Sequence, residues 1–319
     1  MKYLITGSGG FIGFHLSKEL LKNKENFVYG IDNLDNYYST KLKRKRIFHL
    51  KKHRNYLNIK VDLSNEKSMK KLKKHNFDIV FHLAAQAGVR YTVKNPNKYV
   101  STNIIGYLNL LKYLEKNTAK IIFYASSSSV YGDNKDYPVN EKMLPKPKNI
   151  YAFSKLSNET FAKLFSKMFN KKFIGLRFFT VYGKWGRPDM LIYKFLTSSK
   201  KKQTFYINNY GKDLRDFTYI EDVIKILLIL IKKRKSLKNE DLFNICSNNP
   251  IKTINIINTL NKFSKTKTKL LKANKIEMLK THGDNTKIKK FTLFKNFSKF
   301  DDKIEECILW YEKNFKLFI

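Results

Sequence analysis

Three glycines near the N-terminus constrain the fold of this chain more than any other feature. Gly7, Gly10 and Gly13 follow a short apolar run, Tyr3-Leu4-Ile5, and open a helical pattern over residues 11–21. Glycines at this spacing allow a tight turn, a close approach of a diphosphate to the backbone, and close packing of a helix on a strand. The helix N-terminus adds free N–H groups and a positive dipole. The segment therefore predicts a dinucleotide-binding turn.

Short apolar runs alternate with helical patterns through the first 180 residues. The helical patterns are clearest over residues 11–21, 99–114 and 152–169. The apolar runs that predict strands are residues 3–5, 27–31, 57–61, 79–83, 121–125 and 173–177. Strands separated by helices form a parallel sheet that is covered on both faces. We therefore predict an α/β fold with a doubly wound parallel sheet, a Rossmann fold, over residues 1–180.

The alternation breaks down after Thr180. Helices are expected over residues 191–199, 220–233 and 301–315, and the remainder is short, basic and irregular. In doubly wound folds, ligands bind at the carboxyl ends of the strands. We expect residues 181–319 to form mainly a smaller C-terminal α/β lid that binds substrate, with some segments returning to the main sheet.

The net charge of +38 at pH 7 admits two interpretations. A nucleic-acid-binding protein that retains the fold is one, because lysine and arginine displace counterions from phosphates. However, the basic residues are spread through every segment and no nucleic-acid motif accompanies them. We therefore favour a basic surface without a nucleic-acid partner, which would still attract an anionic substrate.

The remaining composition favours a globular cytoplasmic protein. Hydrophobic residues make up 42% of the chain, but the longest apolar run, residues 226–231, is too short to cross a membrane. The N-terminus enters its glycine turn too early for a signal peptide. The two cysteines, Cys246 and Cys307, cannot form a disulfide framework, and no Cys/His cluster has zinc spacing. We predict neither a metal site nor a membrane partner.

Carboxylates at the ends of predicted strands favour NAD as the cofactor. Asp32 ends the second strand, 19 residues after Gly13. A carboxylate there accepts hydrogen bonds from the adenosine ribose and repels a 2′-phosphate, so NAD is favoured over NADP. Asp62 follows the third strand, within reach of the adenine amine. The small residues Ala84 and Ala85 end the fourth strand and let a dinucleotide lie against the backbone.

Tyr151 and Lys155 are the predicted reacting groups. Residues four apart share one face of a helix, so an ammonium can stabilise a phenolate there. An isolated phenol has a pKa near 10, and Lys155 with the positive nicotinamide ring is expected to lower it. Tyr151 would then remove a proton from a sugar hydroxyl. Ser127, at the end of the fifth strand, is expected to hydrogen-bond the same oxygen.

These motifs resemble the extended short-chain dehydrogenase/reductase superfamily and, more closely, its UDP-glucuronate 4-epimerases. The resemblance covers nearly the first 225 residues. The segments that carry it are residues 7–13, 30–34 with Tyr37-Tyr38, 82–91, 124–132, Tyr151 with Lys155, 176–183, 185–190, 210–212 and 215–222. It implies a tightly bound NAD that takes the C4 hydride of UDP-glucuronate and returns it to the opposite face after the 4-keto sugar rotates. The product is UDP-galacturonate, a precursor of polysaccharides.

The resemblance also implies individual site residues and a homodimer built from the helices near residues 99–114 and 152–169. The implied cofactor site comprises Gly7, Gly10, Phe11, Ile12, Gly13, Asp32, Asn33, Asp62, Leu63, Leu83, Ala84, Ala85, Asn103, Tyr151 and Lys155. The implied substrate site comprises Gln86, Arg90, Ser127, Ser128, Ser129, Thr180, Arg187, Arg215 and Asp284. Within it, Thr180, the two serines and Arg187 would hold the sugar carboxylate, and Arg215 would bind the diphosphate.

Enzymes of related families, which catalyse other reactions, differ from this chain at some of these positions. Nucleotide-sugar 4,6-dehydratases have an Asp-Glu pair where this chain has Ser128-Ser129, and decarboxylases that make UDP-xylose usually have a glutamate at Ser129. A 4-epimerase of neutral UDP-sugars, UDP-glucose or UDP-N-acetylglucosamine, remains the alternative and usually has asparagine at Thr180. The chain departs from the family pattern at Lys184, usually proline, and around His282-Gly283-Asp284.

Overall fold

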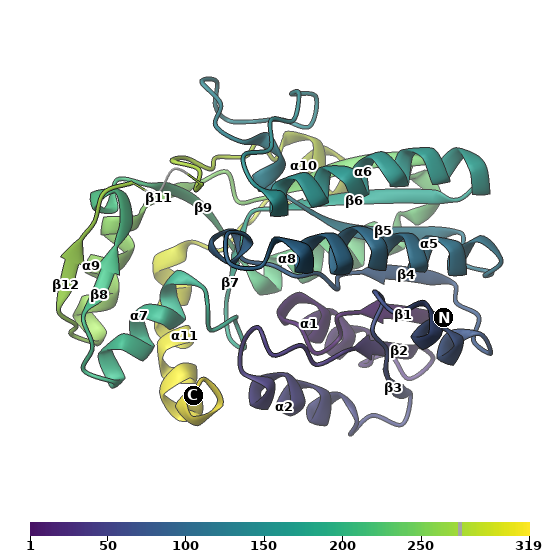
Figure 1. The fold of residues 1–319 in the computed structure, drawn as a ribbon, viewed down its shortest axis with the longest axis horizontal. Coiled ribbons are helices and arrows are strands. Elements are labelled where there is room, and N and C mark those ends of the chain that lie inside the picture. Colours follow the sequence, from purple (N-terminus) through teal and green to yellow (C-terminus); the bar gives the residue numbers. More distant parts are fainter. Residues whose placement is uncertain (274–275) are drawn as a thin grey trace.

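The main sheet of the protein is parallel throughout. The computed structural model describes residues 1–273 and 276–319, and in these residues seven strands lie in the order β3-β2-β1-β4-β5-β6-β10 (Figure 1). Their bounds are β1 (Lys2–Thr6), β2 (Phe27–Asp32), β3 (Tyr56–Lys60), β4 (Ile79–His82), β5 (Ile121–Ser127), β6 (Lys172–Phe178) and β10 (Glu240–Ile245). The predicted doubly wound fold is confirmed.

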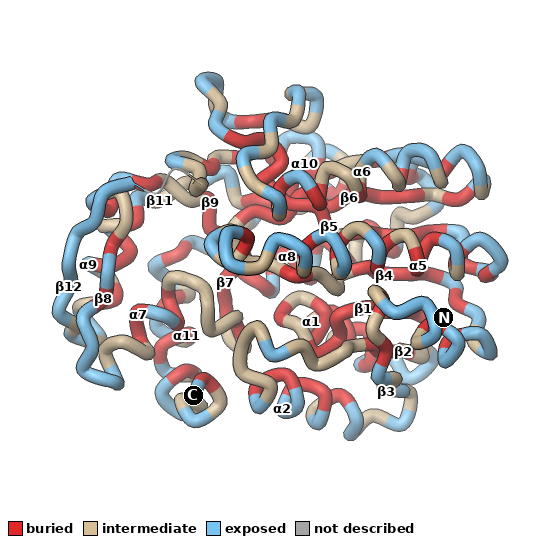
Figure 2. The backbone as a smooth tube through the Cα atoms, viewed as in Figure 1, coloured by how far each residue is buried: buried red, intermediate tan, exposed pale blue. Residues whose placement is uncertain are grey.

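Helices cover both faces of this sheet. The chain forms α1 (Phe11–Leu20), α2 (Thr40–Leu50), α3 (Glu66–Met69), α4 (Pro96–Tyr99), a π-helix (Val100–Ile105), α5 (Gly106–Glu115), α6 (Ile150–Phe169), α7 (Leu191–Lys200), α8 (Ile220–Lys232), α9 (Thr253–Phe263), α10 (Thr286–Thr292) and α11 (Phe300–Asn314). Figure 2 shows that the central strands of this sheet are largely buried, whereas the outer sides of the helices are exposed.

Alternating strand residues belong to two separate cores. Tyr3 and Ile5 pack with α1 and α8 on one face, whereas Leu4 packs with α5 on the other. Because successive side chains of a strand point to opposite faces, a strand covered on both faces must be apolar at nearly every position. This requirement explains the continuous apolar runs in the sequence.

The region after Thr180 is more regular than predicted. Its strand β10 joins the main sheet beside β6, with Phe243 opposite Leu176. A three-stranded sheet contains β7 (Thr180–Tyr182), β9 (Leu214–Tyr219) and β11 (Pro250–Lys252), and a two-stranded sheet pairs β8 (Phe205–Ile207) with β12 (Thr268–Leu270). The expectation of an irregular remainder was wrong, because short strands at wide sequence separation give little local signal.

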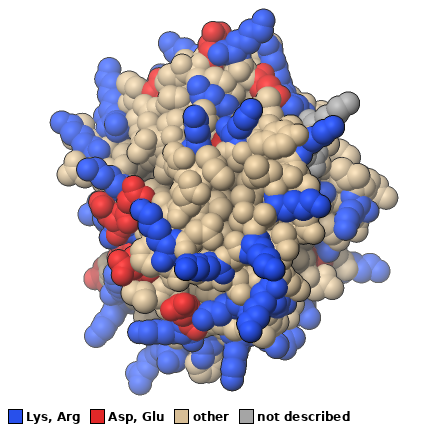
Figure 3. Space-filling model, turned by 90° about the vertical axis from the view of Figure 1, so that its left-hand side faces the viewer, with Lys and Arg blue, Asp and Glu red and all other residues tan. Residues whose placement is uncertain are grey.

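Basic side chains are dispersed on the face formed by the smaller part of the molecule. In Figure 3, Lys and Arg lie around this face instead of gathering into one stripe, with few acidic side chains between them. Within residues 1–273 and 276–319, the structure contains no helix with the length and apolarity needed to cross a membrane.

Candidate active site

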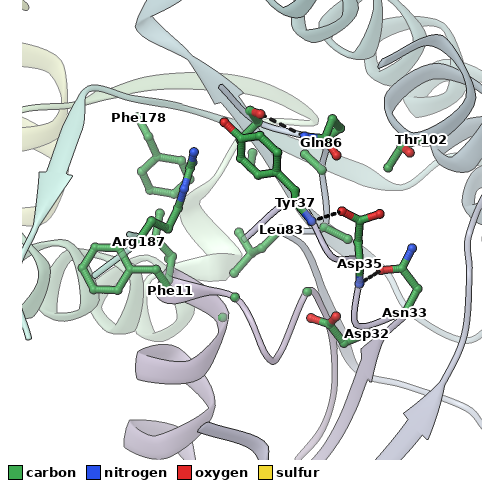
Figure 4. A pocket seen from close by; sticks show the side chains of 18 of the residues that line it. Phe11, Asp32, Asn33, Asp35, Tyr37, Leu83, Gln86, Thr102, Phe178 and Arg187 are labelled. Atoms are coloured by element: carbon green, nitrogen blue, oxygen red, sulfur yellow. Dashed lines mark hydrogen bonds between the residues drawn. The ribbon is translucent and has the colours of Figure 1, made fainter. Parts of the chain in front are cut away.

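The carboxyl ends of the parallel strands surround one elongated cavity of about 250 Å³. Its wall includes residues from the ends of β1, β2, β4, β5 and β6, together with residues that follow Thr180. Figure 4 shows Asp32 and Asn33 at one side of this cavity and Phe11, Phe178 and Arg187 at the other. The cavity therefore spans from the glycine turn to the region of the predicted reacting groups.

The glycine turn has no room for side chains. A Cβ on Gly13 would lie 2.2 Å from the Gly7 carbonyl oxygen, and one on Gly10 would lie 2.9 Å from the same atom. Gly7 itself has φ +72°, which favours glycine, and its added Cβ would collide with the backbone of Ala84. Helix α1 begins at Phe11 without a side-chain cap, so its first N–H groups are free to bind a phosphate. This cradle fits a dinucleotide.

Asp32 lies where a ribose-binding carboxylate is expected. Its Oδ2 accepts a hydrogen bond from the Gly9 amide at 3.1 Å, and its Oδ1 accepts one from the Leu34 amide at 2.8 Å. The neighbouring Asp62 accepts hydrogen bonds from the Ser64 hydroxyl and from the Asn33 side chain, and these bonds lower its pKa against the opposing effect of burial. Both carboxylates are therefore held by hydrogen bonds and line the cavity.

Most of the predicted cofactor residues line the cavity, and one does not. Those in its wall are Gly7, Gly10, Phe11, Ile12, Gly13, Asp32, Asn33, Asp62, Leu63, Leu83, Ala84, Ala85, Tyr151 and Lys155. Asn103 lies in the π-helix, fully buried. Its side chain accepts a hydrogen bond from the Gln86 amide at 2.8 Å and donates one to the Gln86 carbonyl at 3.0 Å. Its contacts therefore hold Gln86, which does line the cavity.

Tyr151 and Lys155 both reach the cavity from the first turns of α6. Asn149 caps this helix by accepting a hydrogen bond from the Ala152 amide at 2.9 Å. The Lys155 ammonium donates to the Ala125 carbonyl at 2.8 Å, and burial lowers its pKa to about 8. Lys155 thereby ties the helix to the end of β5.

The pKa of the Tyr151 phenol differs from the sequence-based expectation. Burial raises it above its ordinary value, and this effect outweighs the lowering by a hydrogen bond with Ser127 and by the charge of Arg187. Lys155 is not among the groups that lower the phenol pKa here, and its ammonium donates to the Ala125 carbonyl instead. The lowering expected from Lys155 together with the positive nicotinamide ring stays a prediction.

Arg187 is partly buried in an ionic network that the sequence did not reveal. Its Nε donates to Asp189 Oδ1 at 3.0 Å, and a second guanidinium nitrogen donates to Asp189 Oδ2. The Tyr37 hydroxyl, from the loop after β2, also donates to Asp189 Oδ2 at 3.1 Å. Arg187 lowers the pKa of Asp189 in spite of its burial. Tyr37 and Asp189 stand in motifs that were recognised, but no local pattern links positions 152 residues apart.

The other predicted substrate residues are spread around the cavity. Gln86, Ser127 and Arg187 line it. Ser128 and Ser129 occupy a buried turn after β5, in which the Ser129 amide donates to Ser127 Oγ at 3.2 Å, and Thr180 starts β7.

Three further predicted substrate residues, like Ser128, Ser129 and Thr180, lie outside the cavity wall, and these three have partners of their own. Arg90 pairs with Glu277, and Arg215 pairs with Asp213 at 3.2 Å. Asp284 accepts a hydrogen bond from the Thr286 amide at 2.8 Å.

Comparisons with known proteins agree with this geometry. The sequence model of the NAD dependent epimerase/dehydratase family matches residues 3–246. Protein CapI of Staphylococcus aureus is 38% identical over 283 residues, which cover 83% of this chain and 84% of that protein. UDP-glucuronate 4-epimerase 2 of Arabidopsis thaliana is 37% identical over 282 residues, which cover 83% of this chain and 64% of the longer plant protein.

A solved structure resembles nearly the whole chain. The crystal structure of UDP-glucuronic acid 4-epimerase from Bacillus cereus, in complex with UDP-glucuronic acid and NAD, matches with a TM-score of 0.90 and 30% identity, covering 98% of this chain and 100% of that one. Because a family model spans most of the sequence and the relatives align along most of its length, the protein belongs to the NAD-dependent epimerase/dehydratase family.

Proposed function

We propose that this protein is an NAD-dependent 4-epimerase that interconverts UDP-glucuronate and UDP-galacturonate. The observation that carries the proposal is one cavity whose wall contains the glycine cradle, Tyr151, Ser127 and Arg187. The glycine cradle supplies a dinucleotide site, and Tyr151 supplies a proton acceptor beside it. Arg187 adds a partly buried cation that suits a sugar carboxylate. The likeness to UDP-glucuronate 4-epimerases supports this substrate over a neutral sugar.

Bound NAD would accept the C4 hydride of the sugar and return it to the opposite face of the ring. Gly7, Gly10 and Gly13 would hold its diphosphate, and Asp32 its adenosine ribose. Tyr151 would take the proton of the C4 hydroxyl while Ser127 donates a hydrogen bond to the same oxygen. Because burial raises the phenol pKa, proton transfer requires additional positive charge, which Lys155 and the oxidised nicotinamide would provide.

The carboxylate of the sugar requires its own restraint. A 4-keto uronate is a β-keto acid and loses carbon dioxide when its carboxylate aligns with the ketone. We infer that Arg187, Ser128, Ser129 and Thr180 hold the carboxylate away from that alignment. The guanidinium is already oriented by Asp189, which leaves its remaining face for the substrate. Gln86, Arg90, Arg215 and Asp284 are proposed to contact the UDP moiety.

The proposal is tested by incubating the purified protein with UDP-glucuronate and separating the products by chromatography. We expect UDP-galacturonate without UDP-xylose. A Tyr151→Phe variant should retain bound NAD and lose activity by about 10²-fold or more, because it lacks the proton acceptor. Turnover of UDP-glucose or UDP-N-acetylglucosamine without turnover of UDP-glucuronate would instead support the neutral-sugar alternative.

The assembly is proposed to be a homodimer. Apolar side chains are exposed on the π-helix at Val100 and Ile105 and on α6 at Phe153, Leu164 and Met168. The three on α6 recur at intervals that place them along one side of the helix. A second copy of the chain that pairs these helices would bury them.

The remaining expectations are also proposals. We infer a cytoplasmic location, which suits two buried free cysteines, and a role in supplying UDP-galacturonate for polysaccharide synthesis. Residues 1–180 are proposed to bind NAD and to carry the catalytic serine, tyrosine and lysine. Residues 181–319 are proposed mainly to hold the nucleotide sugar. β10 joins the main sheet from the second segment.

A further inference from the structure

Arg46 is a buried cation whose four hydrogen bonds all go to neutral oxygens. It lies on α2 and is 0% exposed. One terminal nitrogen donates to the Gly9 carbonyl at 2.8 Å and to the Tyr38 hydroxyl at 2.9 Å. The other donates to the Trp185 carbonyl and, at 3.2 Å, to the Gly186 carbonyl. Burying a charge without a carboxylate is unfavourable, so packing alone does not account for an arginine here.

The oxygens that Arg46 binds belong to two segments that the proposed reaction needs. Gly9 lies inside the glycine turn, between the cavity-lining residues Gly7 and Gly10. Trp185 and Gly186 directly precede Arg187, which lines the other side of the cavity. A planar guanidinium presents its donors in a fixed fork, which a flexible ammonium does not reproduce. Arg46 therefore fixes the distance between the two segments.

The segment around Trp185 needs such external support. Trp185 has φ +62°, a left-handed conformation that residues other than glycine rarely adopt. The preceding Lys184 carbonyl accepts a hydrogen bond from His15 Nε2 at 2.9 Å. Burial, in opposition to that bond, lowers the pKa of His15 to about 3, so this histidine is neutral and carries its proton on Nε2. Arg46 and His15 thus hold successive carbonyls of one strained turn.

We propose that Arg46 is a positioning residue that couples the cofactor turn to the Arg187 segment. Through this link, the guanidinium of Arg187 is placed relative to the bound dinucleotide, and hence relative to the sugar. The role of Arg46 toward the sugar rests on the proposed function, whereas its role in holding the Trp185 turn does not. Removal of the fork should therefore loosen the turn and weaken recognition of the uronate more than recognition of UDP.

The two tryptophans of the chain allow the turn to be observed without substrate. Trp185 and Trp310 are in contact, with ring centroids 4.9 Å apart. A Trp310→Phe background leaves Trp185 as the single emitter and keeps an aromatic neighbour. In this background, Arg46→Lys retains the charge and Arg46→Met removes it. Arg44→Met, an exposed position on the same helix, is the matched control.

Three measurements are compared: acrylamide quenching of Trp185, NAD affinity by calorimetry, and the affinities for UDP-glucuronate and UDP. For both Arg46 variants, we expect increased quenching and an affinity for UDP-glucuronate reduced about ten- to hundredfold, as for a lost hydrogen bond to a charged group. The affinity for UDP should change far less. NAD affinity should fall in both variants, and the Arg44 control should match the parent.

Two results would overturn the inference. Quenching of Trp185 that is unchanged in both Arg46 variants would show that the fork does not hold the turn. Equal losses of affinity for UDP and UDP-glucuronate would indicate a general structural role. If the parent protein binds NAD and UDP but does not prefer UDP-glucuronate, the proposed substrate is wrong, and the quenching comparison still decides the role of Arg46. Arg46→Lys provides the readout should Arg46→Met fail to fold.

Discussion

Replacing Lys155 by methionine is expected to stabilise the folded chain and to abolish its activity. Lys155 is 1% exposed, and burial lowers its pKa from 10.5 to about 8. A change of this size means that the charged side chain costs the folded state about 3 kcal/mol at pH 7. Methionine fills similar space without charge, but the Ala125 carbonyl then loses its donor, which costs about 1–2 kcal/mol. The net gain in the free energy of unfolding should be about 1–2 kcal/mol.

The gain in the free energy of unfolding should decrease as the pH rises. Between pH 8 and 10.5, the unfolded chain retains the Lys155 proton whereas the folded chain has released it. The stability contribution of this lysine therefore rises with pH through that window. As a result, the stability of the methionine variant relative to the parent should be highest below pH 8. It should fall by about 3 kcal/mol as the pH approaches 10.5, so that the variant becomes the less stable of the two.

Urea unfolding at several pH values, followed by tryptophan fluorescence, measures this difference. Lys163→Met, at an exposed position of the same helix, is the control and should stay within about 0.5 kcal/mol of the parent. A Lys155 variant that is less stable than the parent at pH 7, by an amount that does not vary with pH, would refute the reasoning. In that case the ammonium would be better compensated than its burial implies.

Three further changes probe the cradle, the core and the surface. Gly13→Ala should weaken NAD binding roughly ten- to hundredfold in a calorimetric titration, because its Cβ would lie 2.2 Å from a backbone oxygen; unchanged affinity would argue against the cradle. Glu159→Gln should lower the free energy of unfolding by about 3–5 kcal/mol, because Glu159 is the counterion of the buried Arg177 guanidinium, 2.7 Å away. A loss below about 1 kcal/mol in urea unfolding would contradict this expectation. Leu164→Glu should convert the proposed dimer to monomers in light scattering, and an unchanged mass would place the interface elsewhere.

Local patterns predicted the parts of the site that lie along one element. The glycine turn, Asp32 at the end of β2, and Tyr151 with Lys155 on one helix all follow from spacing within a strand, a turn or a helix. The same patterns missed contacts across elements. The ammonium of Lys155 binds Ala125 of β5, and Asp189 binds both Arg187 and Tyr37. These partners depend on which elements the sheet order makes neighbours.

The sequence by itself determined that the chain alternates strand and helix, that its strands are buried on both faces, and that a dinucleotide cradle opens the first helix. These properties are local, because side-chain periodicity and glycine geometry are fixed by the backbone within a few residues. Only the tertiary structure decided that β10 returns to the main sheet and that one guanidinium, that of Arg46, links Gly9 to Trp185, which lies 176 positions further along the chain. Such contacts arise when packing brings distant segments together, and periodicity carries no information about them.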